Sequence, residues 1–307
     1  MERSISVGPK RKLLVASVLV ALVAGVAASA QASPAEQASA PVAAGPGAQA
    51  SGALLPANRV VAYYGNPLAP TLGRLGETPA DQMLTRLRQT VAFWKEADPS
   101  RPVKPALELI TPLAQAAPGD EGLYRARMSA DLIEQVAGLA ADNDLLFILD
   151  VQVGRSSVAD ELAPLLPYLR RPHTHLALDP EFAMGSTQVP GQAIGSLDAS
   201  DVNTAVQLLG DLVTAERLPP KLLIVHRFLS SMLTNVGAIQ PDPRVQLVID
   251  MDGFGGPAVK ISKYGTFIRD AGADFGGIKL FYKYDTPLLA PEDLLALDPA
   301  PDVVIYQ

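Results

Sequence analysis

Eight short apolar runs, most of them ending in a charged or polar side chain, constrain the fold of this chain more than any other feature. The clearest spans 145–153 and is apolar until Asp150 and Gln152. Such a run is typical of a parallel strand that is buried on both faces. Segments with helical spacing separate the runs, so the sequence predicts strand–helix alternation around a parallel sheet.

We predict strands over eight ranges, which in chain order are 59–65, 104–110, 145–153, 175–182, 221–227, 245–253, 276–283 and 302–307. Seven helical segments lie between them, including an amphipathic helix over about 80–97 and short helices over about 229–237 and 291–297. Right-handed crossovers leave few other solutions for this order. The expected fold is α/β, a (β/α)8 TIM-barrel-like domain whose eighth helix is missing. That gap leaves a seam for the preceding spacer, a neighbouring subunit or nothing to cover.

The first 58 residues differ in composition from the rest of the chain. Basic residues precede an apolar run from Leu13 to about Val26, and small residues follow it, so we predict a signal peptide over 1–30. An uncleaved membrane anchor is the alternative. Residues 31–58 are rich in Ala, Pro and Gly and predict a flexible linker. The remainder, 59–307, is expected to form a single barrel domain.

Composition limits the partners and the cellular location. The chain has no cysteine, so disulfide and thiolate chemistry are excluded. Its 32 acidic and 25 basic residues give a net charge of −7 without basic clusters, which argues against a nucleic acid partner or an anionic membrane surface. We expect a secreted or cell-envelope-associated protein with no stable membrane insertion after signal cleavage. The oligomeric state stays open.

Most of the predicted strands deliver polar side chains to their carboxyl ends, where the site of such a barrel lies. We predict four catalytic carboxyls, which are Asp150, Asp179, Glu181 and Asp250. The expected substrate-binding residues are Tyr64, Glu108, Gln152, His226, Asp252, Lys279, Tyr282 and Tyr306. This many buried acids require counter-ions, a divalent metal or raised pKa values. A solvated polar rim is the purely structural alternative.

Asp179 and Glu181 provide the sharpest hypothesis. Two positions along a strand place both side chains on one face, roughly 6.5–7 Å apart, where one carboxylate raises the pKa of the other. The pair resembles the Asp-x-Glu at the end of the fourth strand in chitinase-like glycosidases and barrel-type muramidases. The resemblance implies that Glu181 is the general acid and that Asp179 assists it. Leu176 and Leu178 stand where the chitinase motif carries further acids.

The preferred function is therefore that of a glycoside hydrolase-like enzyme that acts on a polysaccharide or cell-wall glycan by carboxylate acid/base catalysis. Aromatic residues at strand ends suit a carbohydrate or other small polar substrate. This hypothesis needs no cofactor and assigns no residue as a metal ligand.

Two alternatives remain. In the first, Glu108, Asp150, Glu181 and Asp250 bind a divalent ion such as Mg²⁺ or Mn²⁺, and Lys279 is the base or Schiff-base amine of a lyase or hydrolase. In the second, the chain is a secreted carbohydrate-binding protein without catalysis.

The domain as a whole resembles a group of uncharacterised secreted or lipoprotein-like bacterial barrel proteins, many of them actinobacterial. The similarity lies in Ala-Tyr-Tyr-Gly at 62–65, Leu-Asp-Pro-Glu-Phe at 178–182, Val-Ile-Asp-Met-Asp-Gly-Phe-Gly at 248–255, Ile-Lys-Leu-Phe-Tyr at 278–282 and Asp-Val-Val-Ile-Tyr-Gln at 302–307. It implies the same fold and cellular location.

Overall fold

Eight parallel strands close into a barrel in the computed structural model, which describes residues 51–269 and 274–307. The order around the barrel is β1-β12-β11-β10-β8-β6-β5-β2. The strands are β1 (Arg59–Gly65), β2 (Val103–Ile110), β5 (Leu146–Val151), β6 (Thr174–Leu178), β8 (Lys221–Arg227), β10 (Val245–Met251), β11 (Phe275–Leu280) and β12 (Val303–Tyr306). The predicted TIM-barrel-like fold is confirmed.

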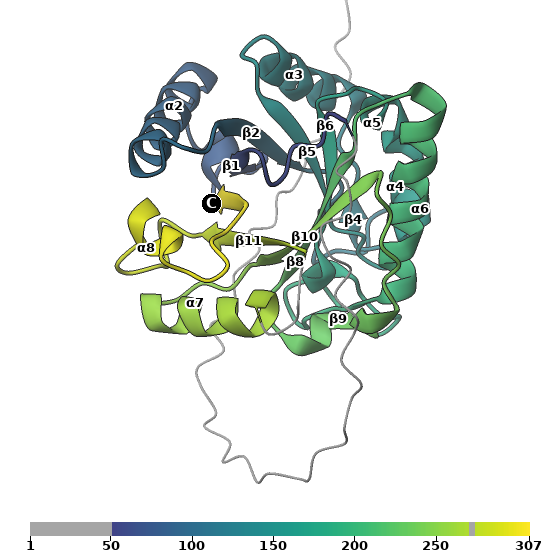
Figure 1. The fold of residues 1–307 in the computed structure, drawn as a ribbon. Helices are drawn as coiled ribbons and strands as arrows, with labels where there is room; N and C mark the ends of the chain where they lie inside the picture. Colours follow the sequence, from purple (N-terminus) through teal and green to yellow (C-terminus); the bar gives the residue numbers. More distant parts are fainter. Residues whose placement is uncertain (1–50, 270–273) are drawn as a thin grey trace, which may run out of the picture.

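Helices surround the strands, as Figure 1 shows. They are α1 (Arg74–Glu77), α2 (Ala80–Ala97), α3 (Ala130–Ala141), α4 (Val158–Leu162), α5 (Leu166–Leu169), α6 (Ala199–Glu216), α7 (Pro257–Tyr264) and α8 (Pro291–Leu295). A 3-10 turn at Ala163–Leu165 joins α4 to α5, and a π-helical turn at Gly265–Arg269 extends α7. The predicted helix over 80–97 is therefore confirmed at both ends.

Two pairs of short strands lie outside the barrel. β3 (Leu113–Ala114) pairs with β4 (Arg125–Ala126), and β7 (Leu197–Asp198) pairs with β9 (Leu233–Thr234). The second pair corrects the predicted helix over about 229–237, where the chain instead forms 3-10 turns at Ser230–Met232 and Val236–Ala238 on either side of β9. The apolar spacing of this segment reflects its contact with the loop before α6 rather than a helix.

Alternation along the strands separates two apolar cores. In β1, Val60, Ala62 and Tyr64 belong to the cluster that fills the barrel, whereas Val61 and Tyr63 belong to the cluster between strands and helices. The inner cluster continues through Ile148, Ala177, Ile224, Val248 and Ile305. Because successive side chains of a strand point to opposite faces, the next inward position of most strands carries a polar group. The barrel therefore has an apolar middle and a polar mouth.

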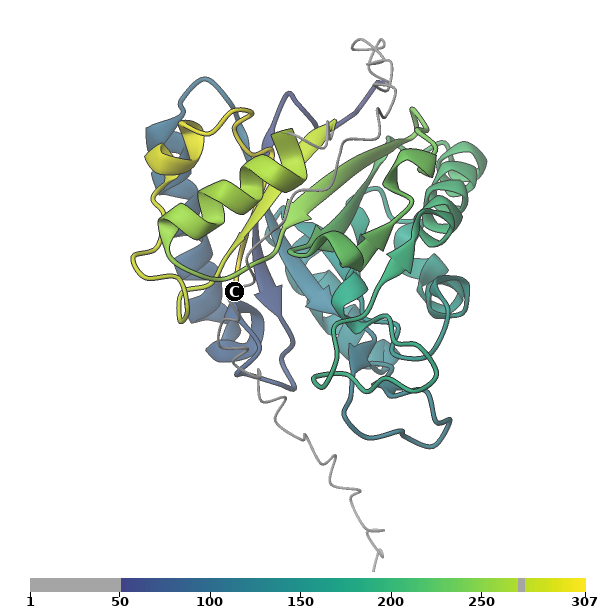
Figure 2. The same ribbon diagram turned by 90° about the horizontal axis from the view of Figure 1, so that it is seen from below.

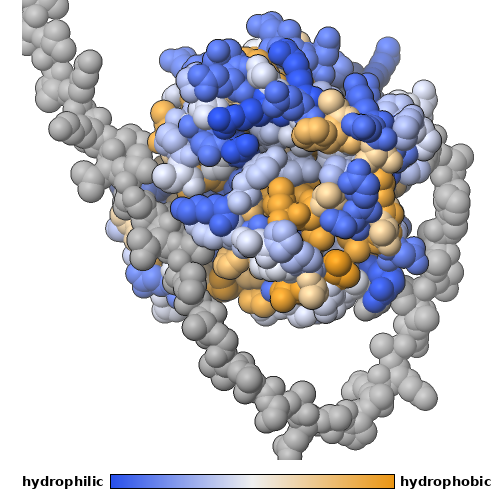
Figure 3. Space-filling model, turned by 90° about the vertical axis from the view of Figure 1, so that its left-hand side faces the viewer, coloured by the Kyte–Doolittle hydropathy of each residue, from blue (hydrophilic) through white to orange (hydrophobic). Residues whose placement is uncertain are grey.

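Side chains from α1, α2 and the loop after β11 cover the seam between β1 and β12. Trp94 of α2 is fully buried and donates its indole N–H to the Tyr306 hydroxyl, 3.0 Å away. Tyr282 stacks on Tyr306 with ring centroids 5.5 Å apart, and the Arg74 guanidinium lies 4.1 Å from the centroid of Tyr282. Trp94, the only tryptophan in the sequence, therefore serves core packing. Figure 3 shows this face of the molecule, on which apolar side chains gather in the lower middle.

The segment just before β1 closes the base of the barrel. Leu55 is fully buried, and the Gln246 side chain accepts hydrogen bonds from the amides of Leu54 and Leu55 at 2.9 and 3.1 Å. Gln246 also donates to the Leu55 carbonyl at 2.8 Å. In Figure 2 these first described residues lie at the upper end, and the strands run toward the lower end, where longer loops gather. The linker predicted over 31–58 therefore differs at its end, because residues near Leu55 pack against the domain.

Two sequence predictions concern membrane association, namely the absence of stable insertion and the signal peptide. Within 51–269 and 274–307, no helix has the length and apolar character needed to cross a bilayer. The predicted signal peptide over 1–30 lies outside the described residues.

Candidate functional site

A ring of buried polar side chains occupies the carboxyl ends of the barrel strands. Tyr64, Asp150, His226, Asp250 and Lys279 each stand one residue before the end of their strand. Glu108 of β2 lies at the same level, because it pairs in register with Tyr64. Each of these six side chains is at most 3% exposed. The structure thus brings together groups that the sequence placed on six different strands.

His226 lies at the centre of this ring. Its Nδ1 is 3.0 Å from Asp250 Oδ2, and its Nε2 is 3.1 Å from Glu108 Oε1 and 3.7 Å from Asp150 Oδ1. Burial acts to lower the pKa of His226, but the hydrogen bonds to Asp250 and Glu108 outweigh it and raise the pKa well above its usual value. One imidazole therefore links carboxyls from three strands.

The ring carries more negative than positive groups. Its five carboxyls belong to Glu108, Asp150, Asp179, Asp250 and Asp252, and its basic groups to His226 and Lys279. All seven side chains are buried. Four carboxylate oxygens in this set have no hydrogen-bond partner among the described residues, namely Glu108 Oε2, Asp150 Oδ1, Asp250 Oδ1 and Asp252 Oδ1. A buried carboxylate oxygen without a partner is costly, so the ring is electrostatically incomplete.

Protonation offsets part of this excess. Burial raises the pKa of Asp150 to about 6, against the attraction of His226. Burial and the charge of Asp150 raise the pKa of Asp179 to about 7. Tyr64 donates its hydroxyl to Asp150 Oδ2 at 2.9 Å, and Gln152 Nε2 lies 3.3 Å from Asp179 Oδ2. Tyr64 and Gln152 thus connect the two carboxyls.

Asp179 and Glu181 are close together, but the expected strand geometry is wrong. β6 ends at Leu178, and Asp179 caps a 3-10 turn over Pro180–Phe182 by accepting a hydrogen bond from the Glu181 amide at 3.2 Å. The proline after Asp179 has no N–H to continue the ladder, so the strand stops there. Glu181 is partly exposed at the rim, whereas Asp179 is 2% exposed. Burial and the charge of Asp179 raise the pKa of Glu181 to about 8.

Lys279 is a counter-ion in this ring. Its Nζ donates to Asp252 Oδ2 at 3.0 Å and lies 3.9 Å from the centroid of the Tyr64 ring. Burial acts to lower the pKa of Lys279, but attraction to Asp252 and the other carboxylates raises it. An ammonium held in this way does not fit the alternative in which Lys279 acts as a base or a Schiff-base amine, because both roles need a neutral amine.

Sequence reasoning missed the buried ion pair behind Lys279. Lys260 of α7 lies 2.9 Å from Asp285, and it also donates to the carbonyls of Gly253 and Lys279 at 2.6 and 2.7 Å. This pair fixes the loop after β10 to the end of β11. The sequence pattern could have indicated that Lys260 is buried. Lys260, Tyr264 and Phe267 have the helical i, i+4, i+7 spacing of one face, which lies toward the barrel.

Two predicted substrate-binding tyrosines lie outside the ring. Tyr306 is 4% exposed and faces Trp94 on the outer side of β12, so its prediction as a mouth residue is wrong. Tyr282 stacks on Tyr306 at the same seam. Tyr282 is 39% exposed, so its ring remains accessible to a substrate. Two further exposed aromatics are Phe254 and Tyr284, which are 44% and 40% exposed, with ring centroids 5.4 Å apart.

The loop over 184–197 is tied to its neighbours. Arg155 donates two hydrogen bonds to the Gln188 carbonyl at 2.9 and 2.8 Å, and the Gly195 amide donates to the Glu181 carbonyl at 2.7 Å. The loop is therefore ordered, and it supports the backbone of Glu181.

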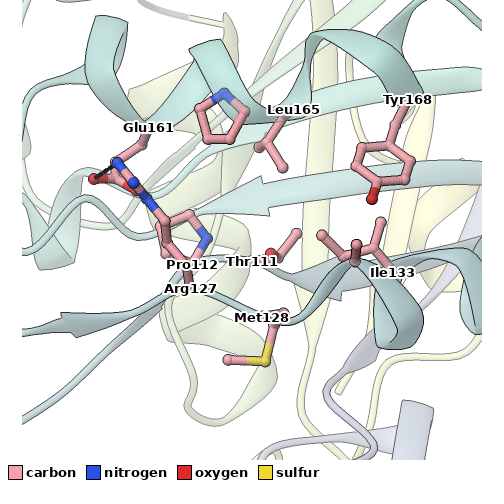
Figure 4. A pocket seen from close by; sticks show the side chains of 10 residues that line it. Thr111, Pro112, Arg127, Met128, Ile133, Glu161, Leu165 and Tyr168 are labelled. Carbon is pink, nitrogen blue, oxygen red and sulfur yellow. Dashed lines mark hydrogen bonds and ion pairs between the residues drawn. The ribbon is translucent and has the colours of Figure 1, made fainter.

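A separate small cavity lies outside the barrel wall, between α3 and the helical segment 158–169. Figure 4 shows Ile133, Leu165 and Tyr168 around it, with the ion pair of Arg127 and Glu161 at one side. None of the ring carboxyls lines this cavity.

Comparisons with known proteins give no information on the chemistry of the site. No protein-family model and no curated protein matches the sequence. One similar solved structure is that of an uncharacterized B. cereus protein, with 10% identity and a TM-score of 0.35. The match covers 81% of this chain and 60% of that one, so this chain spans about three fifths of the length of its neighbour.

Proposed function

We propose that this chain is a secreted glycoside hydrolase-like enzyme that cleaves a polysaccharide or cell-wall glycan, with Glu181 as the general acid. One observation carries the proposal. Glu181 is the partly exposed carboxyl at the rim, and its pKa is raised to about 8. A carboxyl that keeps its proton at neutral pH can protonate the oxygen of a glycosidic bond as the bond breaks.

Asp179 supports Glu181 through the backbone and through charge. It accepts hydrogen bonds from the Glu181 amide and from Gln152, so its position is fixed. Its negative charge disfavours ionisation of Glu181. Asp179 is therefore a positioning residue for the acid.

Glycoside hydrolysis also needs a second carboxylate. Asp250 and Asp150 are fully buried and bonded to His226 and Tyr64, so they suit a structural role under the mouth. Asp252 is 7% exposed and has one carboxylate oxygen without a partner among the described residues. Asp252 is thus the acid of the ring best suited to reach a substrate.

Phe254 and Tyr284 support a carbohydrate as substrate. Both rings are exposed, and Phe254 stands two residues after Asp252. The apolar C–H face of a sugar packs against such rings while its hydroxyls bond to carboxylates.

The test is turnover of insoluble and soluble glycans, including chitin and peptidoglycan, by the wild-type chain and by Glu181→Gln. We expect Glu181→Gln to lower kcat by about 10²- to 10⁴-fold, because it removes the proton donor, while substrate binding is retained. Asp142→Asn, at an exposed acid in the turn between α3 and the amino end of β5, on the opposite side of the barrel from the mouth, is the matched control and keeps full activity. Full activity of Glu181→Gln would remove Glu181 from its role. Binding of glycans without turnover by the wild-type chain would identify a carbohydrate-binding protein instead.

A further inference from the structure

We infer that Glu108, Asp150 and His226 form a binding site for one divalent transition-metal ion, such as Mn²⁺ or Zn²⁺, beneath the mouth of the barrel. One possible ligand atom from each of the three residues lies within 4.8 Å of the other two. All three side chains are fully buried, and they come from β2, β5 and β8.

Unpartnered oxygens provide an independent reason for a cation at this point. Glu108 Oε2 and Asp150 Oδ1 have no hydrogen-bond partner among the described residues, although both side chains are 0% exposed. Asp150 Oδ1 is also the carboxylate oxygen nearest to His226 Nε2 in that residue pair, at 3.7 Å. A cation here would satisfy oxygens that nothing else in the described chain satisfies.

The spacing of the atoms fits a metal. Ligands that bind an ion at about 2.0–2.2 Å lie about 3.0–3.5 Å from one another in octahedral or tetrahedral geometry. His226 Nε2 lies 3.1 Å from Glu108 Oε1 and 3.7 Å from Asp150 Oδ1. The three candidate atoms lie within 4.8 Å of one another, so the carboxylates would move inward to bind one ion.

The other nitrogen of His226 is arranged as a metal-bound histidine requires. A histidine that binds a metal through one nitrogen usually donates the other N–H to a carboxylate, which fixes the tautomer. His226 Nδ1 lies 3.0 Å from Asp250 Oδ2, so Asp250 would orient the imidazole. One nitrogen and two oxygen ligands favour Mn²⁺ or Zn²⁺ over Ca²⁺, which prefers oxygen ligands alone.

This set differs from the metal alternative drawn from the sequence. Asp250 stands behind His226 rather than beside it, and Glu181 belongs to the rim. With three protein ligands, the ion would keep positions for water or for a substrate oxygen.

Calorimetric titration of the EDTA-treated, dialysed chain with MnCl₂ or ZnCl₂ tests the site. We expect one ion per chain, weaker binding of Ca²⁺, and loss of binding in Glu108→Gln and Asp150→Asn. Asp250→Asn should weaken binding by about 10- to 100-fold, because it disturbs only the orientation of the imidazole. Asp179→Asn removes another buried carboxyl of the ring without removing a ligand, and it should retain one ion per chain with a smaller loss than Asp250→Asn.

Absence of binding to the wild-type chain would overturn the site, and so would equal affinities of Glu108→Gln, Asp150→Asn and Asp179→Asn. Circular dichroism shows whether each variant is folded. Anomalous diffraction from wild-type crystals soaked in MnCl₂ gives a second answer that does not depend on variants. A peak between Glu108, Asp150 and His226 supports the site, and a peak elsewhere or none refutes it.

The cation site and the proposed hydrolysis fail separately. Glu181→Gln should lower kcat by about 10²- to 10⁴-fold and leave the stoichiometry of ion binding unchanged. Loss of ion binding in Glu181→Gln would mean that the rim carboxyl is itself a ligand, which contradicts the three-residue site.

Discussion

At the scale of single residues, the proposed catalysis at the mouth depends on which carboxyl groups stay protonated at neutral pH. Burial and the charge of Asp179 raise the pKa of Glu181 to about 8. As a general acid, Glu181 is therefore active below this value and loses its proton as the pH rises through it. Activity should be retained at neutral pH and fall above about pH 8.

Asp179→Asn tests whether the charge of Asp179 sets the pH above which activity falls. It removes a neighbouring negative charge, so the pKa of Glu181 should fall and the alkaline limb of the kcat profile should move down by about one pH unit. The profile of Asp142→Asn should match that of the wild-type chain. An unshifted limb in Asp179→Asn would show that the charge of Asp179 does not raise the pKa of Glu181.

Single residues also show how far the sequence could be followed. Asp150 and Asp250 were expected at the mouth because each follows an apolar stem, and the structure places both there. Tyr306 was misplaced because a shift of one residue along a strand moves a side chain to the opposite face, and no polar pattern marks the register of β12. The central position of His226 depends on contacts with Glu108 and Asp250, which lie 118 and 24 residues away in sequence.

At the scale of elements, a buried carboxylate joins α4 to the β3–β4 hairpin. Glu161 is fully buried and accepts hydrogen bonds from Arg125 at 2.8 Å and from Arg127 at 2.8 and 3.0 Å. Burial acts to raise the pKa of Glu161, but the hydrogen bonds from Arg127 and Arg125 outweigh it and lower the pKa. The stability from this pairing is therefore present above the pKa of the unfolded chain and is lost as the pH falls.

Glu161→Gln should lower the free energy of unfolding by about 3 kcal/mol, because Arg127 loses its carboxylate partner and Arg125 keeps only the exposed Glu121. Urea denaturation at pH 7 measures the loss. Glu134→Gln is the control, since Glu134 also accepts two hydrogen bonds from one arginine, Arg171, but both side chains are more than 40% exposed. It should cost less than about 1 kcal/mol. Equal losses would mean that burial does not decide the strength of the pairing.

The predictions of strands and helices include both the most accurate and the least accurate of the sequence predictions. All eight barrel strands were predicted, since apolar runs bounded by glycine, proline and acids are unambiguous when helices separate them. The segment over 229–237 was not, because short apolar stretches do not distinguish a helical turn from a strand that finds its partner elsewhere. That partner, β7, lies more than thirty residues upstream.

At the scale of the whole molecule, stability depends partly on a segment that composition assigned to a linker. Leu55 fills the base of the barrel, and the Gln246 side chain makes three hydrogen bonds to Leu54 and Leu55. Removal of a buried leucine side chain costs about 2–5 kcal/mol. The Ala/Pro/Gly-rich composition did not predict this packing, because Leu54 and Leu55 are the only large apolar residues of the segment that make these contacts.

A chain that begins at residue 59 should therefore be less stable than one that begins at residue 51 by at least about 2 kcal/mol. Thermal and urea unfolding of the two chains measure the difference. Gln246→Ala in the longer chain should lose part of the same stability, because the segment stays present but loses its hydrogen bonds. Equal stabilities of the two chains would show that residues 51–58 add nothing to the barrel.

The described chain begins at the base of the barrel, so its amino-terminal end lies on the opposite side of the domain from the polar mouth. Leu55 lies beside Gln246 near the start of β10, whereas Asp250 and Asp252 lie at its far end, so the point of entry and the polar mouth are at opposite poles. A support attached directly at residue 51 would lie on the side of the domain opposite the mouth. A tag or surface linked through the amino terminus should leave the site open, which is the orientation to choose when the protein is immobilised.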